Sequence, residues 1–250
     1  MTTYFLAVTY RGTNYAGFQI QENSSTIQGE VEKVLRTYLQ QDDKLTGSSR
    51  TDTGVHALIN YFHFTMDGIL NEKMLYNLNA MCPLDITIKG IYIMHDEAHS
   101  RFDASSRVYG YYISNQKNPF LTDRAWFCPY PMNKILLDAA ASIVMGQHDF
   151  TSFAKKNSQV KTHICTISLC TWEETEHGWK FTVEGNRFLR GMVRGLVATM
   201  VKVGRQKISL DEFMHVLNSK DNTMADFTAP AHGLFLEKVN YPYAVDSRSI

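Results

Sequence analysis

The order of the secondary-structure elements expected in the N-terminal part of the chain constrains the fold most. Short segments rich in β-branched and aromatic residues indicate strands, and apolar residues at helical spacing indicate helices. The expected strands are residues 3–10, 44–47, 61–64 and 86–94. The expected helices begin at the capping-box sequence Ser25-Thr26-Ile27-Gln28 and at residue 71. Strand, helix, strand, strand, helix, strand is the order of a split βαβ unit, which predicts a ferredoxin-like half.

The second part of the chain repeats this order less regularly. Strands are expected at residues 107–113, 162–172, 179–184 and 235–239, and helices at residues 133–145, 187–203 and 209–217. Ser209, with Glu212 three residues later, marks the start of the last of these helices as a second capping box. We therefore expect an α+β fold with a central antiparallel sheet, built from two ferredoxin-like or RRM-like α/β halves, residues 1–104 and 105–250.

The composition excludes several classes of protein. Hydrophobic residues make up 44% of the chain and charged residues 20%, which is typical of a globular protein. The cysteines form no CxxC pair, the histidines lack metal-ligand spacing, and no Walker or dinucleotide-binding fingerprint occurs. We therefore expect no disulfide scaffold, no metal and no cofactor. No apolar stretch approaches the ~20 residues of a membrane span, and the first residues lack a signal-peptide layout, so we expect a cytoplasmic protein without a membrane segment.

The most unusual segment is the loop at residues 47–57, in which small and polar residues surround Asp52 and Arg50. The simplest interpretation is a turn in which the Asp52 side chain bonds its own backbone as an Asx turn. Asp52-Thr53-Gly54 is also the core of the aspartic-protease signature, but that chemistry needs a second carboxylate loop in the chain or in a dimer. The chain has no second Asp-Thr/Ser-Gly sequence, so an aspartic protease is the less favoured of these two interpretations.

Two segments, Tyr10 to Gln19 and the RTDTGVH sequence from Arg50 to His56, resemble the tRNA pseudouridine synthase A family. Further matching segments follow along the chain in the order found in the family. They are Asn79-Ala80, Pro83 to Ile86, His99 to Ala104, Arg107 to Tyr111, His148 to Phe153, Phe188 to Gly204, Ala231 to Leu236 and Val239 to Pro242. The resemblance thus spans essentially the whole chain, which makes it far more specific than any single loop.

The resemblance implies a reaction and the residues that perform it. The family breaks the N1–C1′ glycosidic bond of a uridine, turns the uracil over and rejoins it through C5. Asp52 matches the catalytic aspartate and would be the nucleophile, because a carboxylate can attack an electron-poor carbon and leave again. Tyr109 matches the tyrosine that lies against the uracil and assists proton removal at C5. Arg194 matches the basic residue that forms a salt bridge with Asp52, which would lower the pKa of that carboxyl group.

Judged from the residues alone, the favoured interpretation of Tyr109 is one of several strand aromatics, and that of Arg194 or Arg50 an ordinary surface charge. The resemblance makes Arg50 the loop arginine that helps to extrude the target nucleotide, since a stacked base must flip out at a cost of a few kcal/mol. The RNA contacts that we expect are Arg50, Arg11, His56, Arg107, Arg190 and Lys155.

The resemblance also implies the substrate and the assembly. It predicts that the substrate is tRNA, modified at positions 38, 39 and 40 of the anticodon stem-loop in a cleft between the two halves of the pseudouridine synthase fold. It predicts a homodimer. Two alternatives stay open: a synthase of the same fold that modifies another RNA such as rRNA, and a non-catalytic RNA-binding module that keeps the fold.

Several residues depart from the pattern of the family, among them Val108, Gly110, Gly191 and three residues in or next to the first two matching segments. Phe18 stands where Trp is usual, Thr53 where Ala is usual and Ser49 where Gly is common. None of them is one of the three expected catalytic residues, so the departures concern the substrate site.

The charge balance predicts a localised RNA groove. The chain has 25 basic and 25 acidic residues and therefore a formal net charge of zero. Basic residues nevertheless gather between Arg187 and Lys207, where no acidic residue occurs, and again at Lys155, Lys156 and Lys161. Because phosphate contacts need local rather than net charge, we expect RNA binding that weakens as salt rises.

Overall fold

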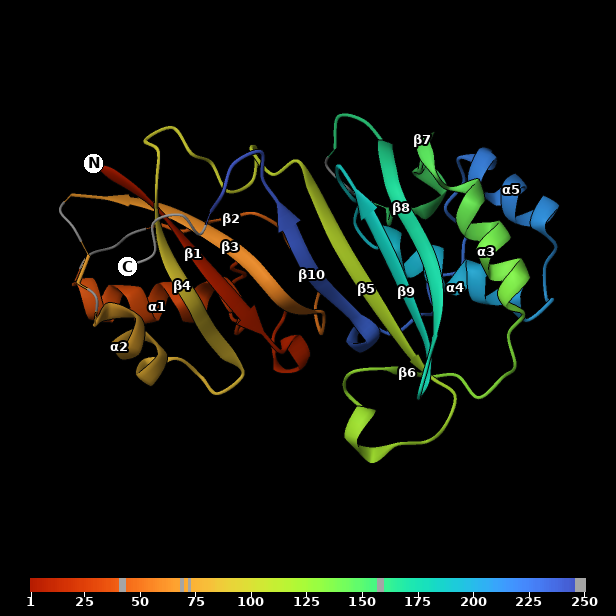
Figure 1. The fold of residues 1–250 in the computed structure, drawn as a ribbon, viewed down its shortest axis with the longest axis horizontal. Helices are drawn as coiled ribbons and strands as arrows, with labels where there is room; N and C mark the ends of the chain where they lie inside the picture. Colours follow the sequence, from red (N-terminus) through yellow and green to blue (C-terminus); the bar gives the residue numbers. More distant parts are fainter. Residues whose placement is uncertain (41–43, 68–69, 72, 157–159, 246–250) are drawn as a thin grey trace. The chain divides into compact units, whose positions relative to one another are not determined.

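The computed structural model describes residues 1–40, 44–67, 70–71, 73–156 and 160–245 (Figure 1). The chain forms two compact units. The first unit consists of Met1–Ser106 together with Leu236–Ile250, and the second consists of Arg107–Phe235. The first unit is thus built from both ends of the chain, whereas the second is one continuous segment.

The first unit contains a sheet in which β1 lies between two antiparallel neighbours. The strand order is β4-β1-β3-β10, with the short β2 also paired to β3. Leu6 of β1 faces Phe62 on β3 and Ile91 on β4. The strands are β1 (Thr2–Tyr10), β2 (Thr46–Gly47), β3 (His56–Met66), β4 (Ile86–Met94) and β10 (Leu234–Asn240), which enters this unit from Leu236 on.

Two helices belong to this unit, α1 (Ile27–Leu39) and α2 (Met74–Met81). The expected capping box is wrong in its details, because Thr26 and not Ser25 is the N-cap residue of α1. The Thr26 hydroxyl accepts the N–H of Gly29 at 3.2 Å, while the Ser25 hydroxyl donates to Glu30 at 3.1 Å. Thr26 satisfies a main-chain N–H at the helix start, whereas Ser25 bonds the side chain of Glu30.

The β1 strand is buried from Thr3 to Val8, so it carries core residues on both of its faces. Phe5 forms a separate small core with Met94 and Ala98. The segment after β10 packs against this core, since the Tyr241 ring lies 5.4 Å from that of Phe5. The C-terminal segment therefore completes the first unit.

The second unit contains the strands β5, β9, β8 and β7, which are hydrogen-bonded in that order and antiparallel to one another. The short β6 pairs with β5 in parallel. The strands are β5 (Ser106–Ser114), β6 (Trp126–Phe127), β7 (Gly146–Asp149), β8 (Ile164–Thr175) and β9 (Gly178–Gly185). The helices are α3 (Lys134–Ile143), α4 (Met192–Gly204) and α5 (Leu210–Ser219). The 3₁₀ turns of the chain are Gly12–Asn14, Pro119–Leu121, Thr151–Phe153 and Ala231–Gly233.

The described residues therefore form the expected α+β fold, with a mostly antiparallel sheet and five α-helices. The expected capping box of α5 is confirmed, because Ser209 and Glu212 exchange hydrogen bonds of 3.1 and 2.7 Å. The α4 helix begins at Met192 and not at residue 187 as predicted. Gly191 causes this difference, because its φ of 76° is left-handed and interrupts the helical path.

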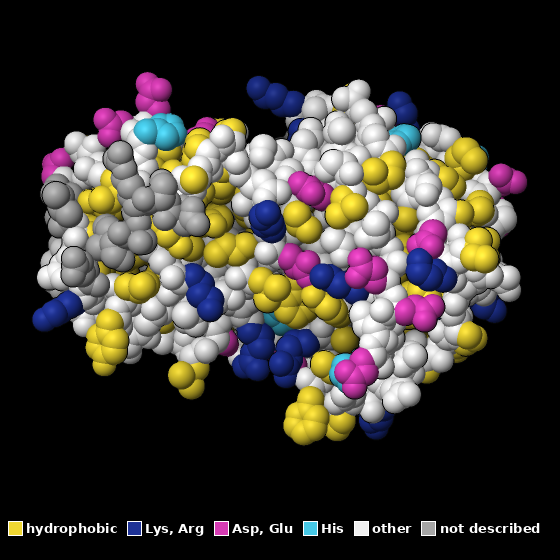
Figure 2. All heavy atoms as spheres, viewed as in Figure 1, with side chains coloured by type: hydrophobic (Ala, Val, Ile, Leu, Met, Phe, Trp, Pro, Cys, Tyr) yellow, Lys and Arg dark blue, Asp and Glu magenta, His cyan; other side chains and the backbone are white. Residues whose placement is uncertain are grey.

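The surface carries basic and acidic side chains interspersed with exposed apolar ones over the face shown in Figure 2. None of the described helices is long and apolar enough to cross a membrane. In the same described ranges, no group of three or more His, Cys, Asp or Glu side chains could hold a metal ion.

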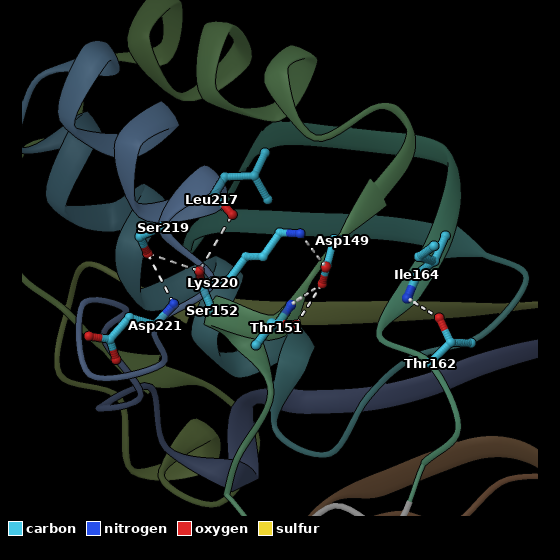
Figure 3. A network of polar contacts seen from close by, with 9 residues as sticks. All are labelled: Asp149, Thr151, Ser152, Thr162, Ile164, Leu217, Ser219, Lys220 and Asp221. Atoms are coloured by element: carbon cyan, nitrogen blue, oxygen red, sulfur yellow. Dashed lines mark hydrogen bonds and ion pairs between the residues drawn. The ribbon is translucent and has the colours of Figure 1, made fainter.

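A polar network joins the turn after β7 to the end of α5 in the second unit (Figure 3). Asp149 Oδ1 accepts the hydroxyl of Thr151 at 2.6 Å and its N–H at 3.1 Å, and Lys220 lies 3.2 Å from Oδ2. The bonds from Thr151 outweigh the effect of burial and lower the pKa of Asp149. Ser152 Oγ adds a 3.2 Å contact with Ser219 Oγ. The turn that leads to Lys155 is therefore fixed.

We expect Asp149→Ala to lower the free energy of unfolding by about 1–3 kcal/mol, because it removes the acceptor of two Thr151 donors. Lys220→Ala is the matched control, since the Lys220 side chain is 64% exposed and surface ion pairs contribute about 0–1 kcal/mol. Urea unfolding of both variants measures the difference. Equal losses in the two variants would show that the ion pair, and not the turn, supplies the stability.

His63 on β3 makes the stability of the first unit depend on pH. Its Nδ1 accepts the N–H of Ser100 at 3.2 Å. Burial first, and then the neighbouring His99, lower the pKa of His63 to about 4, against a smaller opposite effect of Asp103. In the unfolded chain this histidine would titrate near 6.5. The stabilising effect is therefore complete above pH 6.5 and is lost as the pH falls towards 4.

We expect the wild-type protein to lose about 1–2 kcal/mol more unfolding free energy than His63→Gln between pH 7 and pH 5, after allowance for solvent screening. Glutamine cannot take up the proton, so the stability of the variant should depend less on pH. Urea titrations at both pH values measure this difference. Parallel pH profiles for the two proteins would contradict the assignment.

Candidate active site

Asp52 lies in the loop between β2 and β3 of the first unit and is partly buried. The main chain closes a turn here, because the N–H of Val55 donates to the carbonyl of Asp52 at 3.1 Å. Ser48 begins the loop and is tied to β3 by a 2.7 Å bond from its N–H to the Tyr61 carbonyl. The carboxylate is thus carried on a loop whose two ends are both fixed.

The fully buried Asn60 of β3 holds the part of this loop that precedes Asp52. Its amide nitrogen donates to the Ser49 carbonyl at 2.9 Å and to the Tyr10 hydroxyl at 3.1 Å. Its amide oxygen accepts the Ser48 hydroxyl at 2.6 Å. The Asn60 side chain is the centre of this network, which we name the Asn60 network. Buried polar groups with this many partners specify one conformation.

Tyr10 extends the Asn60 network to the residue next to Asp52. The Tyr10 and Thr51 hydroxyl oxygens are 2.8 Å apart, and both side chains are buried. The Thr51 carbonyl in turn accepts the N–H of Phe18 at 3.0 Å. Thr51 is therefore held through its side chain and its main chain, which fixes the position from which Asp52 projects.

His56 joins the Asp52 loop to the loop that carries Arg11. Its Nδ1 accepts the N–H of Gly12 at 3.0 Å, and the residue is only 1% exposed. Only glycine fits at residue 12, because a Cβ there would lie 2.0 Å from the carbonyl oxygen of Val55. The burial of His56 gives it a structural role, and its contact with RNA stays a prediction. Arg11 itself is exposed.

Three of the departures from the family pattern lie around this loop. Phe18 is buried and stacks on Phe62 with a centroid distance of 4.8 Å, so it belongs to the core. Thr53 is exposed. Ser49 Oγ is buried, and no described residue gives it a hydrogen-bond partner. The departures thus alter the packing near Asp52 and leave one hydroxyl available beside the loop.

Tyr109 lies on β5 of the second unit, with its ring held from the side. The ring of Phe188 meets it edge to face at a centroid distance of 5.1 Å. Phe188 belongs to the loop after β9. Asn186 of the same loop accepts a hydrogen bond of 3.0 Å at its carbonyl from Nη1 of Arg107. Tyr109 is only 8% exposed, so its ring has a defined position in the sheet.

Arg194 lies in the first turn of α4, where an arginine is electrostatically disfavoured because the helix dipole is positive there. The first turn of this fully described helix contains no acidic residue. Arg194 Nε donates to the Ala229 carbonyl at 2.6 Å. Nearby, the N–H of Lys155 donates to the Arg190 carbonyl at 2.9 Å. The second unit therefore gathers positive charge at the start of α4, as an anionic ligand requires.

The basic run from Arg187 to Lys207 is not one continuous surface, which corrects the simple interpretation of the sequence. Lys202 forms an ion pair of 2.8 Å with Asp226. The guanidinium of Arg205 lies 3.7 Å from the ring centre of Tyr130. Both of these side chains therefore have partners within the second unit.

The structure therefore brings the expected residues together in two groups. The first unit holds Asp52, Arg50, Arg11 and His56, and the second holds Tyr109, Arg194, Arg107, Arg190 and Lys155. Sequence analysis missed Asn60 and Tyr10. A signal for Asn60 was present, because it lies in phase with the apolar Phe62 and Phe64 on β3, where a polar side chain points into the core.

Comparison with known proteins gives the class of enzyme: the model of a family described as tRNA pseudouridine synthase matches residues 140–242. Proteins named tRNA pseudouridine synthase A match over almost the full length. The one from Azobacteroides pseudotrichonymphae is 40% identical over 97% of this chain and 98% of its own. The one from Bacteroides fragilis is 39% identical over 97% of this chain and 97% of its own. The one from a Thermoanaerobacter strain is 38% identical over 96% of this chain and 100% of its own. The chain belongs to the tRNA pseudouridine synthase A family, which isomerises uridine to pseudouridine.

Proposed function

We propose that this protein isomerises the uridines at positions 38, 39 and 40 of the tRNA anticodon stem-loop, with Asp52 as the nucleophile. The observation that carries the proposal is the full-length match to proteins named tRNA pseudouridine synthase A. The Asn60 network supports the assignment of Asp52, because a nucleophile works best when its position is fixed before the substrate binds.

The reaction moves one bond and exchanges one proton. The N1–C1′ bond breaks and a C5–C1′ bond forms, C5 loses its hydrogen, and N1 gains one. Asp52 assists at the electron-poor carbon and leaves again, so no external group is consumed. We propose that the Tyr109 ring lies against the face of the uracil and that Tyr109 assists the removal of the proton at C5. Arg194 is the proposed basic residue of the site.

Apart from the buried His56, the proposed RNA contacts are all exposed or partly exposed basic residues. Phosphate groups are the ligands that arginine and lysine take in RNA, and such contacts are weakened by salt. The set consists of Arg50, Arg11, Arg107, Arg190 and Lys155.

Release of tritium from [5-³H]uridine in anticodon stem-loops tests the proposal, because the C5 hydrogen must leave. Three RNAs, each with a single labelled uridine at position 38, 39 or 40, should all release tritium. An RNA with cytidine at the three positions and uridine elsewhere is the matched control. Release from an rRNA fragment but from none of the stem-loops would favour the alternative substrate and contradict the proposal.

We also propose that the protein acts in the cytoplasm as a homodimer. Sedimentation equilibrium should then give twice the 28.6 kDa mass of one chain. A single-chain mass at micromolar concentration would contradict the dimer without bearing on the reaction.

A further inference from the structure

The loop from His99 to Asp103 of the first unit presents an aromatic side chain to solvent. Phe102 is 77% exposed, so it contributes little to the core. The loop itself is rigid: His99 and Asp103 exchange two hydrogen bonds of 2.8 and 3.1 Å. The N–H groups of Arg101 and Phe102 both donate to Nδ1 of His99 at 3.2 Å. Phe102 is thus an exposed ring on a loop whose main chain is held in one conformation.

The loop is also tethered to the rest of the first unit. The Tyr243 hydroxyl donates to Asp103 at 2.7 Å, and the Tyr241 hydroxyl donates to the Ser100 carbonyl at 2.6 Å. The fully buried Ser100 donates its hydroxyl to the Thr46 carbonyl at 2.8 Å. Thr46 belongs to β2, which leads into the Asp52 loop. The position of Phe102 is therefore fixed relative to that loop.

Cationic and aromatic groups surround the exposed ring. The His99 ring centre lies 4.2 Å from that of Phe102, and the Arg101 guanidinium lies 5.9 Å from the same ring centre. Together these side chains form what we call the Phe102 platform. An exposed aromatic ring beside arginine is the arrangement with which proteins stack unpaired RNA bases and hold their phosphates.

A second arginine lies close to the Phe102 platform. Burial first, and then the positive charge of Arg101, lower the pKa of Arg50. Two neighbouring guanidinium groups repel each other, and an anionic ligand relieves that repulsion. Since Arg50 belongs to the Asp52 loop, the charge and the exposed ring point to one ligand that reaches both.

We propose that the Phe102 platform stacks an unpaired base of the RNA substrate, with Arg101 holding an adjacent phosphate, beside the Arg50 that precedes Asp52. This proposal adds a binding site to the proposed function, and it rests on RNA being the substrate. It binds the nucleotide that neighbours the one being modified, in a part of the RNA that is not base-paired. The bound base is thereby kept from stacking back on the extruded uridine.

Binding of a fluorescein-labelled anticodon stem-loop to the full-length protein tests the platform without any turnover. Phe102→Ala should weaken binding about 5- to 150-fold, the range that corresponds to the loss of one base–aromatic stack. Phe102→Trp keeps an aromatic face and should bind within about threefold of the wild type. Phe120→Ala is the matched control, because Phe120 is 79% exposed and lies in the second unit.

A comparison of paired and unpaired RNA distinguishes base stacking from electrostatic attraction to the phosphates. With a fully paired RNA duplex as the probe, Phe102→Ala should bind as the wild type does, because no unpaired base is present to stack. Arg101→Ala should reduce the slope of log affinity against log salt by about one for the stem-loop.

Three results would overturn the platform. The first is unchanged stem-loop binding by Phe102→Ala, and the second is an equal loss with the paired duplex. The third is a change of sedimentation mass at unchanged RNA affinity, which would make Phe102 a protein–protein contact. A wild-type enzyme that binds the stem-loop but releases no tritium would instead contradict the proposed function alone.

Discussion

Asp52→Asn is expected to lower turnover of the anticodon stem-loop by at least about 10⁴-fold, the scale on which enzymes lose activity when their nucleophile is removed. Asparagine has nearly the same shape and cannot serve as a carboxylate nucleophile. The Val55 N–H bonds the main-chain carbonyl of Asp52, so this turn does not need the carboxylate. RNA affinity should therefore stay within severalfold of the wild type. Single-turnover tritium release and fluorescence binding measure the two quantities.

Thr53→Ala is the matched control for this experiment. Thr53 is adjacent and exposed, and alanine is the residue usual in the family at this position. The variant should keep wild-type turnover. If Asp52→Asn turned over like Thr53→Ala, Asp52 would not be the nucleophile. If Asp52→Asn lost RNA binding as completely as turnover, the carboxylate would hold the RNA rather than react with it.

Asn60→Ala is expected to have the second largest effect, through the Asn60 network. It leaves the Tyr10 hydroxyl, the Ser48 hydroxyl and the Ser49 carbonyl short of one partner each in a buried site. Each unsatisfied buried group costs about 1–3 kcal/mol, so the free energy of unfolding should fall by roughly 2–4 kcal/mol after local relaxation. Asn60 acts through Asp52 as a positioning residue, so kcat should fall about 10- to 100-fold while KM changes little.

Two milder variants keep this prediction testable if Asn60→Ala does not fold. Tyr10→Phe and Thr51→Val each remove one hydroxyl of the 2.8 Å contact between these residues and keep the shape of the side chain. Each should lower kcat more than it raises KM. Leu58→Ala on the same strand is the control, because Leu58 is 50% exposed and should leave both constants unchanged. A loss of stability without any change in kcat would give the Asn60 network a purely structural role.

The sequence predicted the elements whose periodicity is undisturbed. The 86–94 strand has the predicted bounds, because buried and exposed residues alternate from Ile86 to Lys89 before the register shift near Gly90. The β7 strand was not predicted, because the Gly-Gln-His-Asp sequence is polar and only its pairing with β8 makes it a strand. The start of α4 was misplaced for a local reason, the left-handed Gly191, which no apolar periodicity could reveal.

The residues of the candidate site could be predicted only where they lie within a recognisable sequence motif. Asp52 stands out because small polar residues surround it in one loop. Asn60 was missed because the predicted strand began only at residue 61, and because its importance depends on Tyr10, which is far from it in sequence. The same holds for Phe102, since sequence does not reveal that its ring faces solvent while Ser100, two residues earlier, is fully buried.

The discontinuous first unit has a consequence for biosynthesis. Tyr241 and Tyr243 cover the core around Phe5 and tether the Phe102 loop, and they follow the whole second unit in the chain. The second unit is a continuous segment and can fold while the ribosome is still translating, since domains generally fold as units during synthesis. The first unit must wait for residues 236–245. The nascent chain should therefore expose the incomplete sheet of the first unit to chaperones until residues 236–245 have been translated, and the Phe102 loop should gain its two tyrosine tethers only then.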